Sequence, residues 1–360
     1  MIDKIINQTT PLCFLSNDRL LCYHNRKVLV MNEGKVEKRI PMPVRCKERL
    51  LGGSRCMSRL LRLGVRTAVA IDETGAVLCL GNKLYEINID SCTISDGWNC
   101  GRGIRPLSMT IVKNINGFQD GIYFGGYLGN KEKNPVHIYH RIGQDQWEIV
   151  YTFPERTINH VHCIVTDPYR QCLWVFTGDF DEAAAIWKVT NNFKKMECVV
   201  CNNQQFRGCV AYAVHEGLLY ATDAPNADNF IYLLNPETIK IQPIFPLHGS
   251  CIYGCQWNDN YVFSSTVEGD GQTPDRLRLF FNGDRGDGIK DNYVHLYLGN
   301  HNKGFREIYK EEKDCWSFLF QFGVFKFPYG YNNTDTLYFQ PMATKRNDLS
   351  LMAYKEKTSS

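Results

Sequence analysis

The chain has 360 residues, of which 44% are hydrophobic and 22% are charged, and its formal net charge is +3. This nearly balanced charge, without a basic block, argues against a nucleic-acid-binding protein. The apolar content is sufficient for a large core, and no apolar run approaches the ~18 residues of a membrane-spanning helix.

The N-terminal segment, MIDKIINQTTPLCFLSNDRL, lacks the basic stretch and apolar core that a signal peptide needs. The fifteen cysteines are scattered singly through apolar runs, as at Cys13, Cys79 and Cys163, and an odd number cannot pair completely within one chain. We therefore expect reduced, mostly buried thiols in a cytoplasmic protein.

Short runs rich in Val, Ile, Leu, Tyr, Phe and Trp follow one another along the chain, each bounded by Gly, Asn or Asp. Such runs are typical of β-strands joined by hairpin turns. In chain order they include RLLCYH, KVLVMN, AVLCLG, KLYEIN, GIYFGGY, CLWVFTGD, GLLYATD, NFIYLLN, NYVFSST and TLYFQPM. Helical periodicity is rare, and the pattern predicts only one short helix, near residues 181–185.

The strands recur in units, each a polar-bearing strand, a turn, two apolar strands and often a charged fourth strand. These units start near residues 11, 59, 106, 160, 208, 252 and 317. The gaps between these starts are 48, 47, 54, 48, 44 and 65 residues. Periods in this range are typical of radial repeats with four antiparallel strands per blade. The sequence therefore predicts one all-β domain over residues 1–360, a seven-bladed β-propeller, with six blades as the alternative.

Stacking blades around an axis buries both faces of each sheet, which a single four-stranded sheet cannot do. The seventh unit has only three clear strands, so we expect the N-terminal DKIINQT to supply the fourth and close the ring. The sixth unit is long because residues 268–291 form a polar, glycine-rich loop, of a size that is often functional.

Degenerate turn motifs connect this chain to a known group of propellers. The segment Asn300-His-Asn-Lys-Gly304 matches the S-x-D-x-G core of an Asp-box turn, with Asn in the first two places. Together with RPL, YFGGY, VHIY, TINHVH, DPY, LWV, TGD and YGC, over about residues 55–340, it resembles bacterial sialidase-like propellers of the BNR or Asp-box type. The resemblance implies the sialidase-like fold without a defined activity, and it implies an arginine cluster at the mouth for the carboxylate of a sugar.

In a propeller the first strand of every blade lines the axial channel, so the beginnings of these strands open on one mouth. Arginine suits this position in an anion-binding protein because it holds a carboxylate or sulfate through two parallel hydrogen bonds. Pairing of the arginines with acidic side chains between blades is the alternative. The residues at or near this mouth that we predict to bind substrate are Arg59, Arg105, Tyr127, Gln205, Arg207, Asp223 and Gln321.

Strand alternation places His160 and His162 on one face. Three roles are open for this pair: metal ligation, general acid or base catalysis, and structural hydrogen bonding. A glycosidase needs two carboxyl groups beside the scissile bond, whereas a lyase needs a His or Tyr base with a nearby cation. The predicted catalytic residues are therefore His160, His162, Tyr253, Glu182 and Asp179, with Asp223 as a further carboxylate.

These residues predict a carbohydrate-active propeller that acts on or binds an acidic saccharide, either as a glycoside hydrolase or as a uronate lyase. The alternative is a non-catalytic propeller that binds a glycan or a protein partner, for example in polysaccharide assembly. The fold alone does not choose between them. We expect no cofactor, with a divalent metal on His160 and His162 left open, and no nucleic-acid partner.

Overall fold

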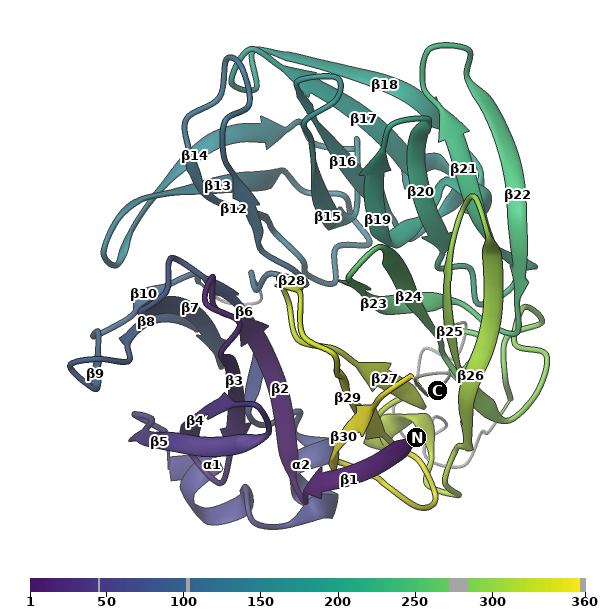
Figure 1. Ribbon diagram of the computed structural model, residues 1–360. Helices are drawn as coiled ribbons and strands as arrows, with labels where there is room; N and C mark the ends of the chain where they lie inside the picture. The colour runs from purple at the N-terminus through teal and green to yellow at the C-terminus, as the bar shows by residue number, and fades with distance from the viewer. Residues whose placement is uncertain (45, 102–103, 272–283, 357–360) are drawn as a thin grey trace.

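Seven β-sheets form a ring around a central axis in the computed structural model, which describes residues 1–44, 46–101, 104–271 and 284–356 (Figure 1). The main strands of each sheet run antiparallel to their neighbours from the axis outward. The predicted seven-bladed β-propeller is therefore confirmed, and the six-bladed alternative is wrong.

The blades are numbered by the order of their innermost strands along the chain. The strands of the first three blades, from the axis outward, are β2 (Thr9–Phe14), β3 (Leu20–His24), β4 (Lys27–Asn32) and β5 (Lys35–Pro41) in blade 1; β6 (Val65–Ala70), β7 (Gly75–Leu80) and β8 (Lys83–Asn88), with β9 (Thr93–Ile94) and β10 (Trp98–Asn99) both paired to β8, in blade 2; and β11 (Thr110–Val112), β12 (Gly121–Gly125), β13 (Val136–Gly143) and β14 (Gln146–Phe153) in blade 3.

The other four blades follow the same order. Their strands are β15 (His160–Asp167), β16 (Cys172–Gly178), β17 (Ala185–Thr190) and β18 (Lys195–Cys201) in blade 4; β19 (Gly208–Val214), β20 (Gly217–Thr222), β21 (Asn229–Asn235) and β22 (Lys240–Leu247) in blade 5; β23 (Cys251–Trp257), β24 (Asn260–Ser265), β25 (Tyr293–Asn300) and β26 (Gly304–Glu312) in blade 6, with β28 (Tyr331–Asn332) parallel to β23; and β27 (Val324–Lys326), β29 (Leu337–Met342), β30 (Leu351–Tyr354) and β1 (Ile2–Ile6) in blade 7.

The two ends of the chain close the ring. Strand β1 pairs antiparallel with β30, with Ile2 opposite Tyr354 and Asp3 opposite Ala353. The N-terminal segment is thus the outermost strand of blade 7, as the sequence predicts. Backbone hydrogen bonds between residues more than 300 positions apart hold the propeller shut.

The core is divided into apolar clusters that fill the spaces between neighbouring blades. Val161 of blade 4 packs in one cluster with Ile138 of blade 3, and Trp174 of blade 4 packs in the next with Leu218 of blade 5. Similar clusters join each of the remaining five pairs of neighbouring blades. Each blade therefore buries both faces, which explains why strands such as β16 are apolar and buried throughout.

The innermost strands share an irregularity near their beginnings. In blades 1, 2, 4, 5 and 6 the pairing with the second strand skips one residue at this point. A β-bulge of this kind leaves one residue unpaired and redirects its side chain. The skipped residues are Leu12, Arg66, His162, Cys209 and Ile252.

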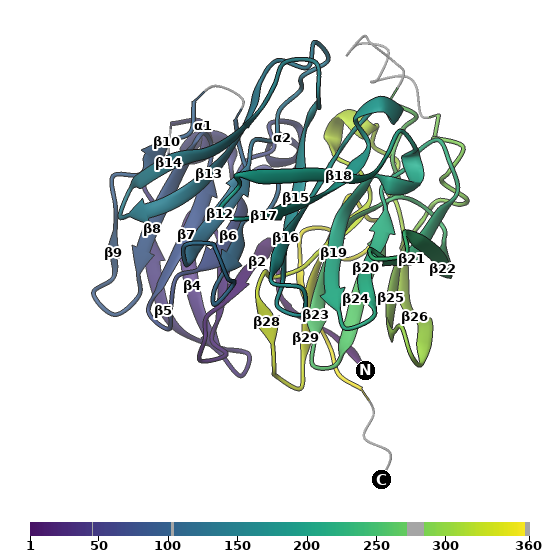
Figure 2. The ribbon, with the colours of Figure 1, turned by 90° about the horizontal axis from the view of Figure 1, so that it is seen from above.

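Short helices lie at the end of the ring where the innermost strands begin. Helices α1 (Cys46–Leu51) and α2 (Arg55–Leu60) lie between β5 and β6 at this rim, where Figure 2 shows them at the top. Because these residues are helical, the inner strand of blade 2 begins only at Val65. The single-turn 3₁₀ helices at the same end are η1 (Asp181–Ala183), η2 (Gln204–Phe206) and η3 (Phe318–Phe320).

The segment between β27 and β29 crosses the opposite end of the ring. Tyr329 N donates to Leu12 O at 2.8 Å and Phe14 N donates to Tyr329 O at 2.9 Å, and β28 pairs with the last residues of β23. The Tyr329 hydroxyl donates to Leu107 O at 2.9 Å. One segment therefore links three inner walls of the channel and leaves the other end as the mouth.

All fifteen cysteines are free, and nine of them are buried. No helix in the described ranges is long and apolar enough to cross a membrane. The glycine-rich loop that the sequence places at residues 268–291 lies partly outside the described residues, since positions 272–283 are not among them.

Candidate functional site

A cavity lined by cationic and aromatic side chains lies at the mouth of the channel. It consists of two adjoining hollows that share Arg62, Arg66, Arg105, Tyr253 and Gln321 on their walls. Lys326 of β27 lines one hollow and Tyr127 lines the other. These side chains come from blades 2, 3, 6 and 7, so residues remote in the sequence converge here. We call this space the central cavity.

Four cations of the central cavity lack acidic partners. Among the described residues, no ion pair or side-chain hydrogen bond involves Arg62, Arg66, Arg105 or Lys326, and the buried Nε of Arg105 has no acceptor. Arg62, Arg66 and Lys326 lie over aromatic rings instead. The guanidinium of Arg66 lies 5.0 Å from the Tyr127 ring centroid, and Lys326 Nζ lies 5.7 Å from that of Tyr253.

The concentration of positive charge also perturbs the protonation of these groups. Burial, followed by the charges of Arg66 and Arg62, lowers the pKa of Lys326 to about 8. Burial and the neighbouring Arg66 also lower the pKa of Arg105. Both shifts have the direction expected for buried cations that lie close together, and an anion placed beside them would oppose the shifts.

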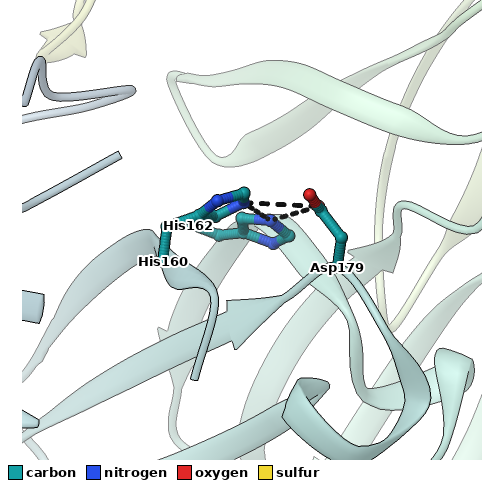
Figure 3. A group of neighbouring side chains, drawn as sticks. All are labelled: His160, His162 and Asp179. Atoms are coloured by element: carbon teal, nitrogen blue, oxygen red, sulfur yellow. Dashed lines mark hydrogen bonds and ion pairs between the residues drawn. The ribbon is translucent and has the colours of Figure 1, made fainter. Parts of the chain in front are cut away.

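A second set of polar groups lies beside this cavity, with its two histidines buried and its aspartate, Asp179, partly exposed. His160 Nε2 lies 3.0 Å from His162 Nε2, and each of these atoms lies 3.3 Å from Asp179 Oδ1 (Figure 3). His160 and His162 begin β15, and Asp179 follows β16, which pairs with it. We call these three residues the histidine cluster.

Local packing fixes the two imidazoles. His160 Nδ1 lies 2.7 Å from Leu128 O, and the ring of Tyr127 lies 4.3 Å from the His160 ring, centroid to centroid. Glycine at position 178 makes room for His162, because a Cβ there would lie 2.4 Å from its Cε1. Since Tyr127 also lines the central cavity, it separates that cavity from the histidine cluster.

Arg207 joins the histidine cluster to a second aspartate. Its Nη2 lies 3.0 Å from Asp179 Oδ1 and 3.1 Å from Asp223 Oδ2. The Cys209 thiol donates to the same Asp223 oxygen at 3.2 Å, while Asp223 Oδ1 is buried without a hydrogen-bond partner. Burial alone would raise the pKa of Asp179, but hydrogen bonds from His160 and His162 and the charge of Arg207 hold it well below its usual range.

The structure brings together nine of the predicted site residues in two groups. Arg105, Tyr127, Tyr253 and Gln321 line the central cavity, while His160, His162, Asp179, Arg207 and Asp223 form the buried network behind Tyr127. The guanidinium, carboxylate and amide groups of the other three predicted residues have partners of their own.

Three predicted residues are engaged elsewhere. Arg59, on α2 and 1% exposed, contributes to the wall of one hollow, but its guanidinium pairs with Asp314 and Asp348 and so anchors the helix as an interblade ion pair. Glu182 is exposed and binds Lys133 at 2.8 Å. Gln205 accepts a hydrogen bond from Tyr232 and donates to Asp228 O, both on blade 5.

The sequence prediction of the site did not include Arg66, Lys326, Cys209 and Glu268. Arg66 and Lys326 each interrupt an otherwise apolar inner strand, VRTAVA and VFK, and this interruption was the available signal. Glu268 accepts a hydrogen bond from Ser250, and burial followed by the charge of Asp223 raises its pKa to about 8. Its position depends on long-range packing that the sequence does not reveal.

Comparisons with known proteins identify the fold. No family model and no curated protein sequence matches the chain. Among solved structures, the chain is similar to the extracellular domain of a putative hybrid two-component system from B. thetaiotaomicron, with 10% identity, a TM-score of 0.56, and coverage of 99% of this chain and 40% of that one. This chain thus spans less than half of that protein's chain.

Two further structures match over nearly their whole length. One is a chain of the mitotic checkpoint complex, with 11% identity, a TM-score of 0.57, and coverage of 99% of this chain and 94% of that one. The other is the β-propeller domain of Myceliophteria thermophila Cps50 (Swd1), with 7% identity, a TM-score of 0.55, and coverage of 99% and 100%. These similarities show the fold alone.

Proposed function

We propose that the central cavity binds an acidic saccharide, and that the unpaired cations Arg62, Arg66, Arg105 and Lys326 hold its carboxylate or sulfate groups. The observation that carries this proposal is the absence of acidic partners for these four side chains among the described residues. Elsewhere in the same protein, buried cations such as Arg59 and Arg207 are fully paired.

The energetics favour an anionic ligand. Holding several cations together without counter-charges is costly, because burial removes solvation and the charges repel one another. An anion that enters the cavity offsets both costs, and arginine can hold its oxygens through paired hydrogen bonds.

The remaining wall suits a sugar. Tyr127 and Tyr253 offer aromatic surface and phenol groups, and Gln321 offers an amide. Such a mixture of flat apolar surface and hydrogen-bonding groups matches a ring that carries hydroxyl groups. The resemblance to sialidase-like propellers, which use an arginine cluster for a sugar carboxylate, supports the same ligand class.

The geometry favours recognition over glycoside hydrolysis. Asp179 and Asp223 are both paired with Arg207, and Glu182 is exposed on Lys133. The predicted carboxylates therefore do not flank the central cavity. One observation keeps hydrolysis as a second candidate: burial, followed by the neighbouring Asp223, raises the pKa of Glu268 to about 8, so that Glu268 holds a proton near neutral pH, as a general acid requires. Loss of turnover in Glu268→Gln would identify that activity.

The test measures binding of uronic-acid and sialylated oligosaccharides, with neutral oligosaccharides and inorganic sulfate as separate arms, by calorimetry. Arg66→Ala and Lys326→Met are expected to weaken binding of the acidic oligosaccharides about tenfold or more each, because a hydrogen bond to a charged group contributes about 1.5–3 kcal/mol. Lys303→Ala, which removes an exposed cation from the turn between β25 and β26, is the matched control.

Three outcomes oppose the proposal. The first is equal binding of neutral and acidic oligosaccharides. The second is binding by the two cavity variants that is as tight as binding by Lys303→Ala. The third is binding of sulfate without binding of any saccharide, which would identify an anion site without sugar recognition. Preferential binding of the acidic oligosaccharides, weakened only by the cavity variants, supports it.

A further inference from the structure

The histidine cluster has the geometry of a metal site. Its three donor atoms, His160 Nε2, His162 Nε2 and Asp179 Oδ1, lie 3.0, 3.3 and 3.3 Å from one another. Ligands that lie about 2.0–2.2 Å from one metal ion are separated by about 3.0–3.5 Å, for bond angles between octahedral and tetrahedral values. The triangle of donor atoms falls within this range, and Figure 3 shows all three side chains pointing toward one another.

The contacts of the cluster turn its donor atoms inward. Leu128 O can only accept, so the 2.7 Å contact with His160 places a proton on Nδ1. A ring that carries this one proton presents the lone pair of its Nε2 to the cluster. Asp179 Oδ1 also faces the cluster, and it accepts from Arg207 Nη2 at 3.0 Å. One metal ion would contact all three donor atoms together.

The surroundings resemble the outer shell of a metal site. A ligating histidine usually donates its other ring N–H to a carbonyl or carboxylate, as His160 does to Leu128, and a ligating carboxylate is itself hydrogen-bonded, as Asp179 is by Arg207.

An independent observation comes from the other side of His162. Asp223 is 3% exposed, its Oδ1 has no hydrogen-bond partner, and donor atoms of Asp223, Cys209 and His162 lie within 4.8 Å of one another. An unsatisfied carboxylate oxygen is costly to bury. With two carboxylates against one guanidinium, the network carries an excess negative charge that a cation would offset.

We propose that His160, His162 and Asp179 bind a divalent transition-metal ion of the zinc class. Two imidazole nitrogens and one carboxylate oxygen suit such an ion, whereas magnesium and calcium prefer all-oxygen sites. This inference does not rest on the proposed saccharide binding, since the two sites use different residues on either side of Tyr127.

The test uses the full-length protein, stripped of metal with a chelator, titrated with zinc chloride and separately with magnesium chloride by calorimetry. Wild type is expected to bind one zinc ion per chain and no magnesium. Asp179→Asn and His162→Gln are expected to lower zinc affinity by about tenfold or more, since each removes a ligand while retaining volume. Arg66→Ala should leave zinc binding unchanged.

Two control variants separate this site from other histidines. His215→Ala removes an exposed histidine of the β19–β20 turn. His248→Ala removes a member of a second His–Asp group, in which His248 Nδ1 lies 2.9 Å from Asp291 Oδ2. Loss of zinc binding in either control, with retention in Asp179→Asn, overturns the proposal.

Cobalt substitution keeps the proposal testable if the buried variants fail to fold. Far-ultraviolet circular dichroism of the metal-free proteins decides whether the variants can be compared with wild type. If they cannot, the visible absorption of wild type loaded with Co²⁺ decides: bands of a nitrogen-ligated, low-coordinate ion support the site, and the spectrum of the hydrated ion overturns it.

Discussion

At the scale of single residues, the two halves of the mouth differ in how their charges are balanced. Arg207 contacts Asp179 and Asp223, whereas Arg66 and Lys326 lie over aromatic rings and have no ion pair among the described residues. Paired charges stabilise the fold, and unpaired ones are available to a ligand. This contrast distinguishes the central cavity from the buried network beside it.

Lys326 makes ligand binding pH-dependent. Its pKa of about 8, lowered first by burial and then by Arg66 and Arg62, means that it loses its charge within the accessible range. Affinity for an acidic oligosaccharide is therefore expected to fall as the pH rises through about 8. Calorimetric titrations across roughly pH 6–10 check this, and Lys326→Arg should remove the decline because arginine stays charged.

Deprotonation of Lys326 does not itself destabilise the fold. Between about pH 8 and 10.5 the unfolded chain holds a proton on Lys326 that the folded chain has released, so this group makes the free energy of unfolding rise with pH. A decline in affinity that persists in Lys326→Arg would show that another group is responsible.

At the scale of elements, α2 is held in place by a buried ion-pair network. Arg59 is 1% exposed and pairs with Asp314 and Asp348, while Arg55 reaches the same aspartates from the surface, with 42% of its side chain exposed. Arg59→Ala is expected to lower the free energy of unfolding by about 3–5 kcal/mol, because it removes the buried cation that Asp314 and Asp348 share and leaves only the part-exposed Arg55 in contact with both carboxylates.

Arg55→Ala is the matched comparison, and its expected cost is below about 1 kcal/mol because exposed ion pairs contribute little. Urea unfolding of both variants measures the difference. If Arg59→Ala is as stable as wild type but loses saccharide binding, Arg59 belongs to the ligand site, and its structural role is refuted.

Sequence patterns predicted the strands well and the helices poorly. Apolar runs bounded by turn residues correspond to β3, β4, β7 and β8, whose alternation and turns are local properties. Helices α1 and α2 have six residues each, too few to show helical periodicity, and so Arg59 seemed to begin a strand. The bulges that redirect Arg66 and His162 depend on pairing with the next strand and leave no sequence signal.

At the scale of the whole molecule, the number of repeats and the closing strand could be predicted because both follow from spacing along the chain. Which charges meet at the mouth could be predicted only in part. His160, His162 and Arg207 could be predicted because they lie where inner strands begin. Glu268 and the partners of Arg59, Asp314 and Asp348, lie in loops that are distant in the sequence, so they could not be predicted. Charge balance is a property of the assembled ring, so it required the structure.

The most direct test of the central cavity is a crystal structure with a uronic-acid oligosaccharide. We predict that a carboxylate of the sugar lies within hydrogen-bonding distance of Arg66 or Lys326, at the end of the ring where the innermost strands begin. A sugar bound on the outer strands, or an empty central cavity at saturating ligand, would contradict this account.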